Sequence, residues 1–226
     1  MIIKVCGMRA PENIREVSAL GVDMLGFVFY KRSPRYVPSV PSRVGLLPDY
    51  ASISEQDDVL RHGPSRVGVF VNEMPQNIIT MVYNYKLDYV QLHGINDEIM
   101  IDNLRRTLDD AIRPGIKFIK AIGVSDVSDI EQWRRYKGVA DILLFQAENG
   151  ACCDCESKFD WSLLTNYDGD IPFIVGGGIG PEDADAVLSL SHPMMLGVDV
   201  NSRFESSMAF KDVSLLSKFV SKVKGL

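Results

Sequence analysis

Eight times along this chain, a short apolar run rich in β-branched residues is followed by a connecting segment. Most of these connecting segments have the hydrophobic periodicity of a helix. Short apolar runs of this kind are typical of strands buried on both faces in a parallel sheet. Eight consecutive β–α units in 226 residues predict a single-domain α/β protein with the (β/α)8 TIM-barrel fold; an open doubly wound sheet is the alternative. The strands are expected at 2–6, 24–30, 66–71, 89–92, 117–122, 141–146, 172–175 and 196–200.

The segments that connect the strands are expected to be mostly helical. No linker-like or low-complexity segment divides the chain, so residues 1–226 are expected to form one domain. The segment 38–64 is rich in proline and polar residues and is expected to be an irregular insertion, with one helix of uncertain limits within 31–64. A long loop is expected at 147–158. Helices are expected at 11–20, 75–85, 96–108, 126–136, 160–166, 181–190 and 211–224.

Charge and cysteine usage limit the possible partners. The net charge of −6 argues against a nucleic-acid or anionic-membrane surface. No run is long enough to span a bilayer, and the chain enters a strand directly after Met1, so the expected location is the cytoplasm. Cys152, Cys153 and Cys155 crowd into one loop with Asp154, but adjacent cysteines rarely reach one tetrahedron, so we expect no metal site.

In a TIM barrel, ligands bind at the carboxyl ends of the strands, so the residues there are the candidates for chemistry. Cys6 ends the first strand and could act as a base or nucleophile, or could be a small buried apolar residue. Arg35 follows the second strand beside other cations and could hold an anion, or lie in a solvated loop. His93 ends the fourth strand and could donate or accept a proton, although a lone histidine is a weak signal.

A triple glycine that includes Gly177 and Gly178 follows the seventh strand and precedes a helix start at Pro181. Exposed backbone N–H groups in such a turn can hold a phosphate dianion, although a tight turn without a ligand has the same pattern. A phosphate site built by the loops after strands seven and eight recurs in TIM barrels, and this position favours phosphate. The polar residues of the eighth strand end that would join the glycines are Asp199, Asn201 and Ser202.

Several motifs stand in order along nearly the whole chain. They are Lys4-Val-Cys-Gly-Met8, Gly26-Phe-Val-Phe-Tyr30, Ser33-Pro-Arg-Tyr36, Gly68-Val-Phe-Val-Asn72, Val90-Gln-Leu-His-Gly94, Phe159-Asp-Trp161 and Gly177-Gly178 with Pro181-Glu182. With these motifs the chain resembles phosphoribosylanthranilate isomerase; only 38–64 and 146–158 fit poorly. The resemblance implies an Amadori rearrangement of N-(5′-phosphoribosyl)anthranilate in tryptophan biosynthesis, by an intramolecular isomerase that needs no cofactor or metal. We expect a monomer or homodimer.

The resemblance also implies roles for residues. Cys6 would be the general base, and an aspartate closing the sixth strand would be the general acid. Arg35, Gln91 and His93 would lie along the substrate. The phosphate end would consist of Gly177, Gly178, Asp199 and Ser202. Asn201, at the same strand end, is expected to join them, and the guanidinium of Arg203 could add charge to this site.

Three positions depart from the family pattern. Gln146 occupies the acid position, and a carboxamide cannot give up a proton near neutral pH. The resemblance implies a lid after the sixth strand, here the loop 147–158. It has Cys153-Asp-Cys-Glu156 where the family has glycines, and Arg203 stands where glycine is common. One hypothesis is a slow isomerase whose acid is Glu148 or Asp154. The other is a degenerate paralogue that binds a sugar phosphate without this activity.

Overall fold

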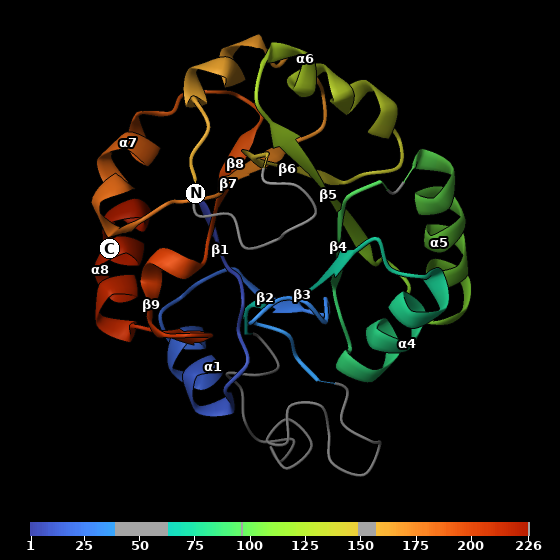
Figure 1. Cartoon of the computed structure of the whole chain (residues 1–226), viewed down its shortest axis with the longest axis horizontal. Helices are drawn as coiled ribbons and strands as arrows, with labels where there is room; N and C mark the ends of the chain where they lie inside the picture. The colour runs from blue at the N-terminus through green and yellow to red at the C-terminus, as the bar shows by residue number, and fades with distance from the viewer. Residues whose placement is uncertain (39–62, 96, 149–156, 226) are drawn as a thin grey trace.

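The computed structural model describes residues 1–38, 63–95, 97–148 and 157–225. Within these residues, eight parallel strands close into a barrel in chain order, with β1 pairing to both β2 and β8 (Figure 1). The predicted TIM barrel is therefore confirmed. The strands are β1 (Ile2–Val5), β2 (Met24–Val28), β3 (Ser65–Val71), β4 (Tyr89–His93), β5 (Lys117–Val124), β6 (Ile142–Ala147), β7 (Phe173–Gly176) and β8 (Met195–Val200).

Helices surround the strands as an outer ring (Figure 1). No helix among the described residues is long and apolar enough to cross a membrane. The α-helices are α1 (Pro11–Ser18), α4 (Pro75–Tyr85), α5 (Glu98–Ala111), α6 (Val127–Ile130), α7 (Ala184–Ser189) and α8 (Val213–Lys224). The 3₁₀ helices are η1 (Glu131–Tyr136), η2 (Trp161–Asn166), η3 (Pro181–Asp183) and η4 (Ser202–Phe204).

Local sequence signals set where these helices begin. Pro11 and Pro75 occupy first-turn positions, where a missing N–H loses no hydrogen bond. The Asp97 side chain accepts from the backbone N of Met100 at 2.7 Å and caps α5. Each of these signals fixes the point at which the helix begins, and so helps to position the loop that follows the strand before it.

Side chains inside the barrel form layers because alternate residues of a strand share a face. One buried cluster includes Ile119 and Ala121 of β5 with Ile142 and Leu144 of β6. A second cluster contains Cys6 with three valines of β2 and β3. The outer faces of the strands pack against the helices in the largest cluster. Polar residues of the site therefore stand on a closed apolar base.

The structure corrects several predicted boundaries. The helix expected at 126–136 is a short α6 continued by η1, and 160–166 is the 3₁₀ helix η2. The stretch 181–190 opens as η3 before becoming α7. The last helix begins at Val213 rather than at Lys211, because Lys211 closes the unpredicted hairpin of β9 (Glu205–Ser207) and β10 (Phe210–Lys211).

Two predicted segments lie largely outside the described residues. The insertion expected at 38–64 falls mostly on 39–62, and the lid expected at 147–158 falls mostly on 149–156. The residues 31–38, which are described, contain turns and one isolated bridge but no helix. The question of a metal at Cys152, Cys153, Asp154 and Cys155 likewise falls outside the described part.

Candidate active site at the carboxyl ends of the barrel strands

A pocket opens at the carboxyl ends of the strands and gathers residues from β1, β4, β6, β7 and β8 and from the loops that follow them. All the predicted site residues except Arg35 and Arg203 line it. The lining residues are Cys6, Gln91, His93, Gln146, Gly177, Gly178, Ile179, Asp199, Asn201 and Ser202.

Cys6 directly follows β1, and its side chain is buried and lines this pocket. Gly26 on the neighbouring strand makes room for it, since a Cβ there would lie 2.8 Å from the Cys6 Sγ. Burial raises the pKa of the Cys6 thiol, and the nearby Lys4 ammonium opposes that rise. The reactive thiolate therefore depends on cations held beside it.

Lys4 is such a cation, and sequence reasoning missed it. Its side chain is fully buried, and its Nζ donates to the Asp199 Oδ2 at 2.7 Å. Burial raises the pKa of Asp199, opposed by the charge and hydrogen bond of Lys4. The second oxygen, Asp199 Oδ1, is buried and has no hydrogen-bond partner among the described residues. The available signal was spacing, because Lys4 and Cys6 are two residues apart on one strand and so share a face.

Gln91 and His93 both come from β4 and contact each other through their Nε2 atoms at 2.5 Å. Both side chains are buried. Burial, together with repulsion from Lys4 and Lys120, lowers the pKa of His93 from its ordinary 6.5 to about 3. His93 is consequently a neutral hydrogen-bonding group at physiological pH rather than a cation or a source of protons.

Arg35 lies beside the pocket, in a buried charge network. Its Nε and Nη2 each donate at 2.8 Å to one oxygen of Glu205. Lys211 Nζ joins the same carboxylate at 2.6 Å and donates to Asn201 Oδ1 at 2.7 Å. Gly7 permits this arrangement, since its φ is +75° and a Cβ there would lie 2.5 Å from both Arg35 Cδ and Asn201 Oδ1.

Sequence reasoning also missed Glu205 and Lys211. Glu205 stands just beyond the eighth strand, where a search of the strand ends could have found it. Lys211 was predicted to be the first residue of the last helix, and nothing in that pattern indicates that its side chain points toward the pocket. Together they hold Asn201 at the pocket wall.

The glycine turn after β7 has the backbone that the sequence suggested. Gly177 and Gly178 have φ values of +84° and +62°, a left-handed conformation that favours glycine. Ser202 begins η4 and lines the same pocket. Arg203 is exposed, forms an ion pair with Glu182 of η3, and is not among the residues with positive φ. Its guanidinium thus joins the loops after β7 and β8.

Gln146 lines the pocket at the end of β6, and its carboxamide makes no hydrogen bond with a described residue. Glu148 lies two residues further along and accepts a hydrogen bond from the Ser125 hydroxyl at 3.2 Å. Asp154, the other alternative acid, lies outside the described residues. Of the two alternative acids, Glu148 is therefore the one that belongs to the described residues.

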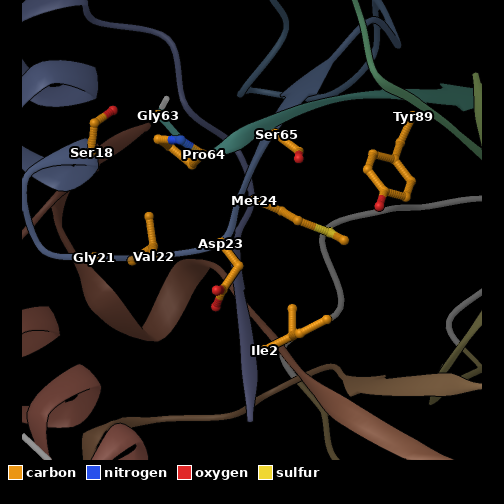
Figure 2. A pocket seen from close by; sticks show the side chains of 10 residues that line it. All are labelled: Ile2, Ser18, Gly21, Val22, Asp23, Met24, Gly63, Pro64, Ser65 and Tyr89. Atoms are coloured by element: carbon orange, nitrogen blue, oxygen red, sulfur yellow. The ribbon is translucent and has the colours of Figure 1, made fainter. Parts of the chain in front are cut away.

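A larger cavity of about 770 Å³ lies at the opposite end of the barrel, near the starts of β1 to β4 (Figure 2). Its charged lining residue is Asp23, whose carboxylate accepts from the backbone N of Ile3 at 2.7 Å. Lys224 also contacts this carboxylate at 2.9 Å. Because its charged group is already engaged in holding β1 and α8, this cavity offers less chemistry than the pocket around Cys6.

Comparison with known proteins identifies relatives of the chain. Residues 3–222 match the family model described as N-(5′-phosphoribosyl)anthranilate (PRA) isomerase. The enzyme of that name from Parabacteroides distasonis is 40% identical over 223 residues, which cover 99% of this chain and 93% of the relative.

Solved structures agree with this result. A phosphoribosylanthranilate isomerase crystallised with reduced 1-(o-carboxyphenylamino)-1-deoxyribulose 5-phosphate superposes with a TM-score of 0.75 at 30% identity, over 100% of both chains. A structure of monomers generated from the dimeric isomerase of Thermotoga maritima gives 0.75 at 31% identity, also over 100% of both chains.

Proposed function

The chain belongs to the N-(5′-phosphoribosyl)anthranilate isomerase family, and we propose that it carries out the family's Amadori rearrangement in the pocket around Cys6. The observation that supports this best is the convergence of a buried thiol, a buried cation and a glycine turn in one pocket. The relatives support the isomerase hypothesis, and no observation favours a degenerate paralogue.

The glycine turn is the proposed phosphate end. Backbone N–H groups at Gly177, Gly178 and Ser202 suit the three terminal oxygens of a phosphate monoester. Asn201, fixed by Lys211, and the guanidinium of Arg203 complete the proposed set. The contacts of Asp199 favour a ribose hydroxyl over the phosphate predicted for it, because a carboxylate repels a dianion whereas its unpartnered Oδ1 can accept from a hydroxyl.

The rearrangement then begins with two proton transfers and ends with a tautomerisation. Protonation of the furanose ring oxygen breaks its bond to C1′, and the nitrogen lone pair forms a Schiff base. The Cys6 thiolate next removes the proton from C2′, and the electron pair flows toward nitrogen to give an enolamine that tautomerises to the ketone. Lys4 supports this step because its charge favours the thiolate over the buried thiol.

Arg35, Gln91 and His93 are the proposed substrate-binding side chains. The neutral His93 and the amide of Gln91 offer hydrogen bonds to the substrate without adding charge. Gln146 stands at the position of the family's acid, where its amide can donate a hydrogen bond to the ring oxygen but cannot transfer a proton. Turnover slower than that of relatives with an aspartate follows from this difference.

The proposal extends to the setting of the reaction. It assigns the protein to tryptophan biosynthesis in the cytoplasm, acting on a phosphorylated small molecule as a monomer or homodimer. The T. maritima relative, a dimer from which monomers were generated, supports either state, and light scattering after size exclusion measures it directly.

The test is the fluorescence change during turnover of phosphoribosylanthranilate by the wild type and by Cys6→Ser. The weak basicity of a buried hydroxyl predicts a loss of about 10²–10⁴-fold in kcat for the variant, the usual contribution of a general base. A thermal unfolding curve of Cys6→Ser controls for misfolding. Undiminished turnover by a folded Cys6→Ser would remove Cys6 from the mechanism.

A further inference from the structure

The proposed reaction needs a proton donor near the ring oxygen, and the residue at the family's acid position is the amide Gln146. We propose that Glu148 donates this proton, so that the acid has moved two residues along the chain, to just past the end of β6. This inference rests on the proposed function and concerns the source of one proton within it.

Strand geometry puts both side chains on one face. Gln146 pairs with Gly123 of β5 and lines the pocket. The ladder continues past β6, since the backbone N of Glu148 donates to Val124 O at 3.3 Å. Residues two apart on a strand share a face and stand about 6.6 Å apart. Glu148 therefore points to the same side as Gln146, one step nearer the mouth.

The absence of a side chain at Gly123 brings Glu148 back toward Gln146. A Cβ at Gly123 would lie 3.2 Å from the Cα, Cβ and Cγ of Glu148. The glutamate side chain thus covers Gly123, which is the residue directly paired with Gln146. Glutamate also has one more methylene than aspartate, which lengthens its reach toward the position that an acid at 146 would serve.

The Glu148 carboxylate is positioned by one hydrogen bond and keeps one oxygen available for another. One oxygen, Oε2, accepts from Ser125 Oγ at 3.2 Å, and the described residues provide no hydrogen bond to Oε1. The residue lines a groove of about 310 Å³ together with Gln146 and His93, so the groove adjoins the pocket around Cys6. Its exposure allows a proton to be regained from water after each turnover.

The other titratable groups facing this groove are engaged or unsuited. Asp129 accepts from the backbone N of Ser125 at 2.8 Å and from Gln132 Nε2 at 3.0 Å. Lys120 donates to Gly94 O at 2.7 Å. His93 is neutral, and Tyr136, whose ring lies under Lys120, has its pKa raised by burial. Glu148 is the carboxylate along this wall with an oxygen left for a substrate.

The step balances without another reactant. The Glu148 carboxyl gives its proton to the ring oxygen, the C1′–O bond breaks with its electrons on oxygen, and the nitrogen lone pair forms the C=N bond. The ring oxygen becomes the 4′-hydroxyl, and Gln146 donates a hydrogen bond to the same oxygen. Glu148 is left as a carboxylate that solvent reprotonates.

The experiment compares kcat and KM for the wild type, Glu148→Gln, Gln146→Asp, the double variant Glu148→Gln/Gln146→Asp, and Glu131→Gln. Glu131 is an exposed glutamate of η1 and serves as the matched control, expected to keep wild-type turnover. Glu148→Gln is expected to lower kcat about 10²–10⁴-fold with little change in KM. Restoring an acid at 146 is expected to recover at least about tenfold of that loss, which a merely structural role of Glu148 would not allow.

Two results would overturn the role of Glu148: wild-type kcat in Glu148→Gln, or a loss that Gln146→Asp does not recover. A wild type without turnover beside an active Gln146→Asp single variant would also overturn it, while leaving the isomerase site standing. No turnover in either the wild type or Gln146→Asp would instead refute the proposed function itself.

Discussion

Lys4→Met tests the buried ion pair on which the site is built. Lys4 is fully buried and the Asp199 side chain is 10% exposed, so removing the ammonium leaves a carboxylate with little access to water. Breaking such a pair by removing one partner costs about 3–5 kcal/mol. For a chain of this size, each kcal/mol lowers Tm by about 2–4 °C, so the expected drop is about 6–20 °C.

The matched control is Lys222→Met. Lys222 pairs with Asp185 at the same 2.7 Å, but the two side chains are 49% and 80% exposed. An exposed pair contributes about 0–1 kcal/mol, so this variant is expected to unfold within a few degrees of the wild type. The assay is thermal and urea unfolding followed by circular dichroism at pH 7.

The pH dependence of Lys4→Met gives a second readout. Without Lys4, burial of Asp199 is opposed only by the charge of Lys211, so its pKa rises further above the ordinary 3.8. Between pH 3.8 and the raised pKa of Asp199, the folded variant binds more protons than the unfolded chain. The stability of the variant therefore falls as the pH rises through that range. Equal losses in Lys4→Met and Lys222→Met, or a Lys4→Met loss that does not vary with pH, would refute the reasoning.

Two other predictions concern groups near the pocket. The pKa of His93 is lowered to about 3, so the unfolded chain binds more protons between 3 and 6.5, and stability should fall by at most about 1.4 kcal/mol per unit as the pH drops below 6.5. For His93→Asn, the unfolding free energy measured with urea should depend less steeply on pH than it does for the wild type. An unchanged pH dependence would contradict a buried neutral histidine. Gly7→Ala and Gly21→Ala share a φ of +75°, which costs about 1–2 kcal/mol in each. Only Gly7→Ala also collides with Arg35 and Asn201, adding about 1–3 kcal/mol; equal losses in the two variants would argue against that collision.

The barrel was predictable because its signal is repeated. Each strand is a short apolar run, and eight of them in order leave few topologies that bury every run. Convergence of Cys6, His93 and Gln146 followed from the same order, since parallel strands bring their carboxyl ends to one side. Helix type was less predictable, because short stretches such as 160–166 give too little periodicity to separate a 3₁₀ helix from an α-helix.

Charge partners were not predictable from the sequence. Arg35 pairs with Glu205 across 170 positions, and many other carboxylates would have been equally plausible partners. Lys211 continued the amphipathic pattern of the last helix, and only the folded chain reveals that it turns inward to Asn201 and Glu205. Lys4 was part of a recognised motif, but its pairing with Asp199 depends on β1 and β8 closing the barrel.

The central claim is that this pocket moves a proton away from C2′ of the ribose through Cys6. The most direct measurement is a single-turnover experiment with phosphoribosylanthranilate labelled with ¹³C at C2′, followed by NMR with the protein in excess. The carbinol carbon is expected to become a ketone carbon with the wild type and to stay unchanged with folded Cys6→Ser. Ketone formation at equal rates with both proteins would contradict it.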